Sequence, residues 1–230
     1  MRVETMPEPT PGPGEVLLGL GAGGICGSDL HYFQDGRVAS FVIREPLIPG
    51  HEASARVAAV GPDVTRVKPG DRVALSPSHP CGRCEACRTG RENLCRQMFF
   101  LGSASVFPHA QGLFREYFVL GERQCYPVTG DVTLGELAFA EPLAVALHAV
   151  DRAGTLLGKD VLIMGAGPIG CLTVVAARLA GATRIVCSDV IDRPLETARA
   201  VGADGAIRAD LTPDAFAERR FDAAIEAAGN

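Results

Sequence analysis

The stretch that decides the fold is Asp160-Val161-Leu162-Ile163-Met164-Gly165-Ala166-Gly167-Pro168-Ile169-Gly170. It opens with a continuous apolar run, which is typical of strands buried on both faces of a parallel sheet. Glycines follow at once, and apolar residues then recur at helical spacing as far as Leu179. A second apolar run begins at Arg184 and ends on Asp189. The sequence therefore predicts strand, glycine-rich turn, helix and strand, which together make one βαβ unit.

The three glycines of this unit match the fingerprint of dinucleotide-binding turns. We expect Gly165 to permit the tight turn, Gly167 to let the backbone approach a pyrophosphate, and Gly170 to let helix and strand pack closely. Pro168 and Ile169 open the helix, whose first N–H groups are free to bind phosphate. A purely structural turn is the alternative, but the strand before the glycines and the helix after them favour nucleotide binding.

An acid about 20 residues beyond the glycines completes the fingerprint. Asp189 stands there and predicts hydrogen bonds to the adenosine ribose, and it favours NAD because a carboxylate repels the extra phosphate of NADP. Arg193, four residues further on, could soften that preference, so NADP stays possible.

The second half of the chain predicts further elements of the same kind. A helix is expected from about Pro142 to Val150, and another near Pro194–Val201. Strands are expected at Gly205–Arg208 and Phe221–Glu226. Because a doubly wound sheet has about six strands and four are found here, we expect the Rossmann domain, residues 154–230, to be incomplete at its C-terminal end.

Residues 1–153 have a different pattern. Short alternating runs such as Ala55–Val60 and Asp71–Leu75 are separated by Gly and Pro turns, and a strand near Glu15–Leu20 leads into a glycine-rich stretch. Many short strands with such turns favour a barrel-like β domain. The predicted fold class is therefore α/β, with a β-rich domain followed by a doubly wound parallel sheet.

The glycine-rich stretch, Gly24-Ile25-Cys26-Gly27-Ser28-Asp29-Leu30-His31, carries a thiol that pairs with a later motif, Gly50-His51-Glu52. Sulfur, imidazole and carboxylate form a ligand set suited to zinc. Three protein ligands leave a fourth position open, which is typical of a catalytic site. Cys26 could instead be a small buried residue, and Glu52 a solvated surface charge.

Four more cysteines form a second candidate metal site. Cys81, Cys84, Cys87 and Cys95 have the spacing Cys-x2-Cys-x2-Cys-x7-Cys, which can close a tetrahedron around one structural zinc. An iron–sulfur cluster or free thiols are the alternatives. A closed site contributes folding free energy rather than chemistry.

Composition narrows the class of protein. The chain has 230 residues, 47% of them hydrophobic and 21% charged, with a net charge of −5, so neither nucleic acid nor an anionic membrane is an expected partner. No apolar run reaches the roughly 20 residues of a spanning helix. Eight cysteines without an apolar leader at the N-terminus favour a reducing, cytoplasmic location.

These motifs together resemble the zinc-containing medium-chain dehydrogenases, and among them the polyol dehydrogenase branch. The resemblance covers essentially the whole chain and includes Phe99-Phe100-Leu101-Gly102-Ser103 and Glu141-Pro142-Leu143. It implies a GroES-like catalytic domain before the Rossmann domain, and a catalytic zinc held by Cys26, His51 and Glu52. It also implies that Glu141 stands at this zinc, directly or through water, where the alcohol dehydrogenase branch has a cysteine.

The resemblance further implies an activity. The expected reaction transfers hydride between NAD or NADP and a secondary hydroxyl of a polyol or of a sugar acid such as L-idonate. Ser28 and His31 match the family's proton relay, although Ser28 could simply cap a helix that begins near Asp29. Family members are usually homodimers or homotetramers and run about a hundred residues longer. We therefore expect the 230-residue chain alone to be poorly active.

Other functions stay open at this point. Within the same class, a sorbitol- or xylitol-type, L-threonine or simple alcohol dehydrogenase is possible, and Glu141 weighs against the last. A protein of a different class, which binds zinc and nucleotide without catalysis, would also fit the motifs.

Overall fold

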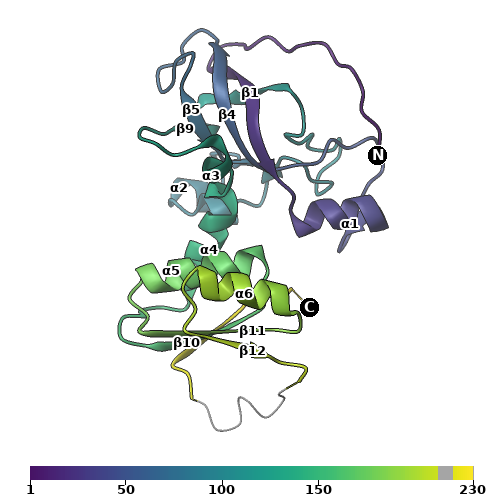
Figure 1. Cartoon of the computed structure of the whole chain (residues 1–230). Coiled ribbons are helices and arrows are strands. Elements are labelled where there is room, and N and C mark those ends of the chain that lie inside the picture. Colours follow the sequence, from purple (N-terminus) through teal and green to yellow (C-terminus); the bar gives the residue numbers. More distant parts are fainter. Residues whose placement is uncertain (212–219, 230) are drawn as a thin grey trace. The chain divides into compact units, whose positions relative to one another are not determined.

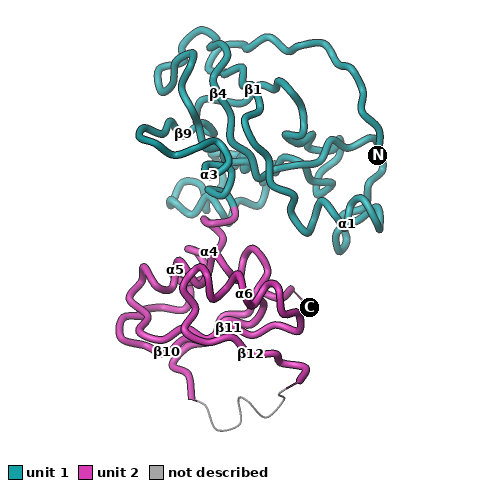
Figure 2. Tube along the Cα trace, viewed as in Figure 1, with its two compact units in different colours: residues 1–141 teal, residues 142–230 magenta. Residues whose placement is uncertain are grey.

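The structure, a computed structural model, describes residues 1–211 and 220–229. The chain divides into two compact units, residues 1–141 and 142–230 (Figure 2). In the described ranges no helix is both long and apolar enough to cross a membrane. The division falls inside a helix, Ala140–Arg152, whereas the sequence places the domain boundary after residue 153. The boundary at 153/154 stays a prediction.

The first unit is built on an antiparallel sheet with the strand order β8-β1-β4-β5-β9 (Figure 1). Its strands are β1 (Glu15–Gly24), β4 (Glu52–Val60), β5 (Arg72–Leu75), β8 (Tyr117–Gly121) and β9 (Cys125–Pro127). The three predicted strands of this sheet, β1, β4 and β5, are confirmed. The first of them, β1, continues four residues past Leu20 and ends two residues before Cys26. Bulges interrupt its register with β4 between Leu17 and Leu18 and between Leu20 and Ala22.

Shorter elements surround this sheet. They are α1 (Gly27–Asp35), α2 (Glu85–Arg88), α3 (Leu134–Ala138), two 3₁₀ turns (Glu92–Leu94 and Glu122–Gln124) and the paired strands β2 (Arg37–Val38) with β3 (Phe41–Val42) and β6 (Ser78–His79) with β7 (Phe99–Phe100). Much of the remaining first unit is irregular, so its backbone N–H and C=O groups need partners outside regular ladders.

The core of the first unit comes from inward-facing residues of the sheet and of the loops beside it. Phe118 is the largest fully buried side chain, and its truncation to alanine would cost about 3–5 kcal/mol. The cluster comprises Val16, Leu18, Ala53, Ala55, Val57, Val67, Val73, Leu75, Leu101, Leu113, Phe118, Leu120 and Cys125.

The second unit contains a parallel sheet with the strand order β12-β11-β10-β13. The strands are β10 (Asp160–Met164), β11 (Arg184–Asp189), β12 (Gly205–Arg208) and β13 (Ala223–Glu226). The helices are α4 (Ala140–Arg152), α5 (Pro168–Leu179) and α6 (Asp192–Ala200). The expected βαβ order is confirmed, with β13 starting two residues later than predicted.

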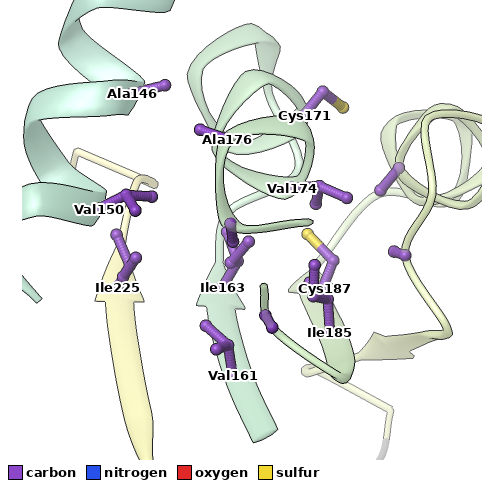
Figure 3. Close-up of a cluster of buried hydrophobic side chains, with 14 of the residues drawn as sticks. Ala146, Val150, Val161, Ile163, Cys171, Val174, Ala176, Ile185, Cys187 and Ile225 are labelled. Carbon is purple, nitrogen blue, oxygen red and sulfur yellow. The ribbon is translucent and has the colours of Figure 1, made fainter. Parts of the chain in front are cut away.

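The helices pack on one face of this parallel sheet. Figure 3 shows Val150 and Val174 facing Val161, Ile163 and Ile225 across a cluster of small and branched side chains. The opposite face carries Leu162, Val186 and Ile207, which are also buried. Burial on both faces explains why these strands read as continuous apolar runs rather than as alternating ones.

A polar hub fixes the far end of α5. The Arg178 guanidinium donates to the carbonyl oxygens of Ala182 (2.9 Å) and Gly202 (3.0 Å) and to the Asp204 carboxylate (2.6 Å). Asp204 also accepts the N–H of Ile185 at 2.7 Å. Burial works against the Asp204 carboxylate, but the Ile185 N–H and Arg178 outweigh it and hold the pKa of Asp204 below its usual value.

We expect Asp204→Asn to lower the Tm of the second unit by roughly 5 °C near neutral pH, as a loss of about 1 kcal/mol does in a unit of this size. Because the folded pKa lies below the unfolded one, the carboxylate stabilises above pH ~4, and its contribution is lost as pH falls through the folded pKa. The difference in Tm from wild type should therefore shrink toward pH ~3. Thermal unfolding measures this, with Asp151→Asn, an exposed carboxylate, as the control. An equal difference in Tm at every pH would contradict the assignment.

Candidate metal centres and nucleotide-binding turn

Three potential metal ligands from two segments of the first unit come together. One ligand atom each from Cys26, His51 and Glu52 lies within 4.8 Å of the other two. Cys26 follows β1 and is the N-cap of α1, while Glu52 opens β4 and pairs with Gly24. A Cβ on Gly24 would lie 2.4 Å from a carboxylate oxygen of Glu52, so a larger residue there would displace this ligand. The sheet therefore brings the thiol and the carboxylate together.

The chemistry of this group fits a metal ion. His51 is 5% exposed, and its Nδ1 finds no hydrogen-bond partner among the residues that the structure describes. A buried polar atom without a partner costs about 1–3 kcal/mol. The nearest carboxylate oxygen, of Asp29, is 3.9 Å from Nδ1, and the Phe100 ring packs against the imidazole at 5.4 Å between centroids. A metal ion bound by this ring would account for its burial with a free nitrogen.

Asp29 is a residue of this centre that sequence analysis missed. Its carboxylate accepts the N–H of Cys26 and the N–H of Gly50, both at 3.0 Å, and the side chain is buried. It thereby ties together the two segments that carry the ligands. Its position three residues after the N-cap has the spacing of a capping box, which is the signal that could have identified it.

Glu141 lies at the edge of this centre. Burial raises the pKa of its carboxyl; His51 opposes the increase and Glu52 adds to it. Both neighbours therefore interact electrostatically with Glu141. Over the described residues, however, the group within 4.8 Å does not include Glu141. Burial also raises the pKa of the Cys26 thiol, and hydrogen bonds from Ser28 oppose that increase.

The two candidate relay residues lie on α1. The helix begins at Gly27 with Cys26 as N-cap, so the alternative that Ser28 is the cap is wrong. Ser28 is half-buried and hydrogen-bonded to Cys26. His31 is exposed, and its Nδ1 lies 3.1 Å from the Asp35 carboxylate one turn later.

The four-cysteine group also assembles as the spacing predicts. One sulfur from each of Cys81, Cys84, Cys87 and Cys95 lies within 4.8 Å of the others. The Cys84 sulfur is 3.5 Å from that of Cys87 and 3.9 Å from that of Cys95, far beyond the S–S bond length of about 2.05 Å. The group is therefore a set of thiols rather than disulfides.

The thiols of this group differ in their proton affinity. The backbone N–H groups of Arg83 and Cys84 lower the pKa of Cys81 to about 6. Burial, followed by the neighbouring Cys84 and Cys95, raises the pKa of Cys87 to about 12. Crowded sulfurs of this kind cannot all lose their protons without a cation, and a zinc ion would supply the missing positive charge.

The glycine turn lies between β10 and α5 in the second unit. Gly165 has φ +97°, in the region that favours glycine, and Gly167 is the N-cap of α5 with Pro168 and Ile169 next to it. A Cβ on Gly170 would lie 1.9 Å from the Gly165 carbonyl oxygen, whereas one on Gly167 would meet nothing within 4 Å. Open space at Gly167 and close packing at Gly170 agree with the different functions predicted for these glycines.

Asp189 stands at the end of β11, as predicted, and already binds the backbone. Its Oδ2 accepts the N–H of Ala166 at 2.7 Å, and its Oδ1 accepts the N–H groups of Val190 and Ile191 at 2.7 and 3.0 Å. The carboxylate therefore fixes the glycine turn as well as being available to a ligand through its remaining lone pairs. Arg193 is exposed on α6.

The other cysteines and histidines of the two units lie in the core or at the surface. Cys125, Cys171 and Cys187 are buried in the apolar clusters, and His79 and His148 are exposed. Among the aromatic residues, Phe100 contacts His51, Tyr32 is buried, and Phe33 and Phe99 are largely exposed.

The two glycines of the turn allow a matched test. Gly170→Ala should destabilise the second unit by about 3 kcal/mol because its new methyl group overlaps a backbone oxygen. Gly167→Ala should leave the Tm unchanged but weaken NADH binding by about tenfold, because the methyl group occupies space that a pyrophosphate would use. Thermal unfolding and NADH fluorescence titration measure the two effects. Wild-type NADH affinity in Gly167→Ala would show that no phosphate approaches this turn.

Comparison with known proteins identifies relatives of this chain. Residues 12–130 match the alcohol dehydrogenase GroES-like domain. The chain is 47% identical over 188 residues to L-idonate 5-dehydrogenase (NAD(P)(+)) of Escherichia coli K12, which covers 82% of the chain and 54% of that relative. It is 44% identical over 208 residues to sorbitol dehydrogenase of Gallus gallus, covering 90% of the chain and 58% of that relative.

A solved structure shares the fold. The crystal structure of L-idonate 5-dehydrogenase from E. coli K-12 matches with a TM-score of 0.87 and 44% identity over 94% of this chain and 62% of that one. The chain thus spans little more than half the length of the two curated relatives. The matching GroES-like domain, the Rossmann-type sheet and the high identity to polyol dehydrogenases show that this chain belongs to the zinc-containing medium-chain dehydrogenases.

Proposed function

We propose that this chain carries the zinc and nucleotide sites of an NAD(P)-dependent dehydrogenase that oxidises a secondary hydroxyl of a polyol or sugar acid. The observation that supports this most strongly is the open group of Cys26, His51 and Glu52, with a buried histidine nitrogen that lacks a partner among the described residues. The second observation is the glycine turn at the start of α5. A metal centre that can activate a hydroxyl and a turn that can bind a nicotinamide nucleotide together suit metal-assisted hydride transfer from an alcohol.

The proposed ligands have separate functions. Cys26, His51 and Glu52 would hold the catalytic zinc, and the four cysteines Cys81, Cys84, Cys87 and Cys95 would hold a structural one. Zinc at the open site would supply a Lewis acid that polarises the substrate hydroxyl. Glu141 interacts with His51 and Glu52 without belonging to the compact group of ligands, which favours an indirect contact with the metal.

The oxidation releases a hydride and a proton from the substrate. NAD or NADP, held at the glycine turn before α5, would supply the electron acceptor for the hydride. Ser28 is half-buried beside Cys26, so its hydroxyl would accept the proton, and exposed His31 would pass it to solvent. Asp35, 3.1 Å from His31, would stabilise the protonated ring during the transfer.

Further observations support a nucleotide preference, a substrate class and a cellular location. Asp189 supports NAD, and the name of the E. coli relative, which includes NAD(P)(+), supports tolerance of NADP. The substrates that the two relatives' names specify, L-idonate and sorbitol, support a sugar acid or a polyol. None of the eight cysteines forms a disulfide in the described structure, which supports a cytoplasmic enzyme. We propose a homodimer or homotetramer for the complete protein.

The direct test is NADH formation by the complete protein that contains these residues, over a panel of aldonates and alditols. We expect turnover with at least one member, because the proposed zinc centre needs only a secondary hydroxyl beside the nicotinamide. Loss of activity on zinc removal and recovery on zinc addition should accompany it. Zinc bound only at the four cysteines, with no hydride transfer from any compound, would instead support a non-catalytic zinc- and nucleotide-binding protein.

Within the same assay, Ser28→Ala should lower kcat by about a hundredfold while zinc content stays that of wild type, as expected for a lost proton acceptor. Ser40→Ala is the matched control, because Ser40 is exposed in the turn between β2 and β3. An unchanged kcat in Ser28→Ala would remove Ser28 from the relay without affecting the zinc assignment.

A further inference from the structure

The segment that leads into His51 has no regular structure of its own. Residues 43–51 belong to no helix or strand, and the segment contains Pro46 and Pro49, which lack a backbone N–H. A metal ligand at the end of such a segment is held in place only if the segment's backbone groups bind elsewhere. Asp29 fixes one of them, the N–H of Gly50. The remaining groups need other partners.

A second irregular segment, loop 103–114, supplies these partners. The backbone N–H of Gly112 donates to the Ile48 carbonyl at 2.7 Å, that of Leu113 to Gly50 at 2.9 Å, and that of Phe114 to Pro49 at 3.1 Å. These three bonds cover the last residues before His51. Their donors are more than sixty positions later in the sequence.

The Gln111 side chain of loop 103–114 binds the middle of the segment before His51, residues 44–50. The Gln111 Oε1 accepts the N–H of Ile48 at 2.8 Å, and its Nε2 donates to the Pro46 carbonyl at 3.1 Å. The amide therefore binds both a donor and an acceptor of the same segment, which matches its own acceptor and donor.

His109 binds the start of the segment. Its Nε2 accepts the N–H of Arg44 at 2.9 Å, and its Nδ1 lies 2.9 Å from the Val106 carbonyl oxygen. Because a backbone N–H can only donate and a carbonyl can only accept, the ring must be neutral with its proton on Nδ1. His109 is 4% exposed, and its backbone N–H donates to the Glu45 carboxylate at 2.5 Å. The bond to Nε2 thus joins the two loops, and the bond from Nδ1 fixes the ring within loop 103–114.

We propose that His109 and Gln111 are positioning residues that hold segment 44–50 and thereby fix the metal ligand His51. Neither belongs to the group of Cys26, His51 and Glu52; they act through the backbone that leads to His51. The inference rests on the proposed zinc centre for its consequence, but its structural step, the fixing of segment 44–50, can be measured without activity.

The test combines local amide hydrogen exchange with zinc affinity. Gln111→Ala and His109→Phe should each raise the exchange rate of amides in segment 44–50 by about tenfold, because each removes hydrogen bonds that hold the backbone of this segment. Each should also lower the affinity of the zinc ion held by Cys26, His51 and Glu52 by about tenfold, as measured by competition with a chelator. The affinity of the zinc ion held by the four cysteines should be unchanged. Mass spectrometry after deuterium labelling and metal analysis provide the readouts.

Gln124→Ala is the matched control. Gln124 is also a buried glutamine of the first unit whose amide binds two backbone groups, the carbonyl oxygens of Ser76 (3.0 Å) and Ser78 (3.3 Å), but it does not touch segment 44–50. Gln124→Ala should lower the Tm without changing the amide exchange rate in segment 44–50 or the affinity of the zinc ion held by Cys26, His51 and Glu52. The control therefore separates a general loss of stability from a specific loss of position.

Two results have different meanings. If exchange at 44–50 and zinc affinity in both variants equal those of wild type or of Gln124→Ala, while wild type binds two zinc ions, the positioning inference is overturned and the proposed function stands. If wild type itself binds zinc only at the four cysteines, the proposed function fails, and the inference that these residues fix a metal ligand fails with it.

Discussion

The Asp29 carboxylate is the interaction on which the candidate metal centre depends. It is 5% exposed and accepts one N–H from Cys26 and one from Gly50, each at 3.0 Å. These donors lie on segments that β1 and β4 bring together at one end of the sheet. Without the carboxylate, two buried N–H groups would lose their partners, at about 1–3 kcal/mol each. The position of Asp29 in the first turn of α1 also suits a negative charge, since helix N-termini are electropositive.

The two units are stabilised by different means. In the second unit, helices and strands of small and branched residues close around an apolar core, so the glycine turn rests on apolar packing. The first unit has a core under its sheet, but long irregular segments extend beyond it. There, polar side chains and clustered thiols replace apolar packing. A metal ion would contribute folding free energy at the four cysteines in the way that a small core does elsewhere.

Local patterns in the sequence predicted most of the fold. The apolar runs of the parallel sheet, the helices between them and three strands of the first unit (β1, β4 and β5) each depend on neighbours a few residues apart, and these were identified, whereas β8 and β9 were not. The spacing of the four cysteines and of the glycines was informative for the same reason. Cys26 and His51 are further apart, and they were paired only because thiol and imidazole are recognisable zinc ligands.

Contacts between residues distant in sequence could not be predicted in this way. Asp29, His109 and Gln111 are ordinary polar residues, and their partners become apparent only once the loops are folded. The backbone hydrogen bonds of Asp189 were also not expected, because the fingerprint predicts a ribose contact and says nothing of the turn itself. Ser28 was considered as the cap of a helix that begins near Asp29, but α1 begins two residues earlier, at Gly27, so Cys26 is the cap.

Anomalous diffraction at the zinc absorption edge, from crystals of the zinc-saturated protein, would locate each bound metal ion. We expect two separate peaks: one among the four sulfurs of the cysteine group, and one within bonding distance of Cys26, His51 and Glu52 with a position left open. A peak at the four sulfurs alone, with Cys26, His51 and Glu52 arranged as described but free of metal, would contradict this expectation.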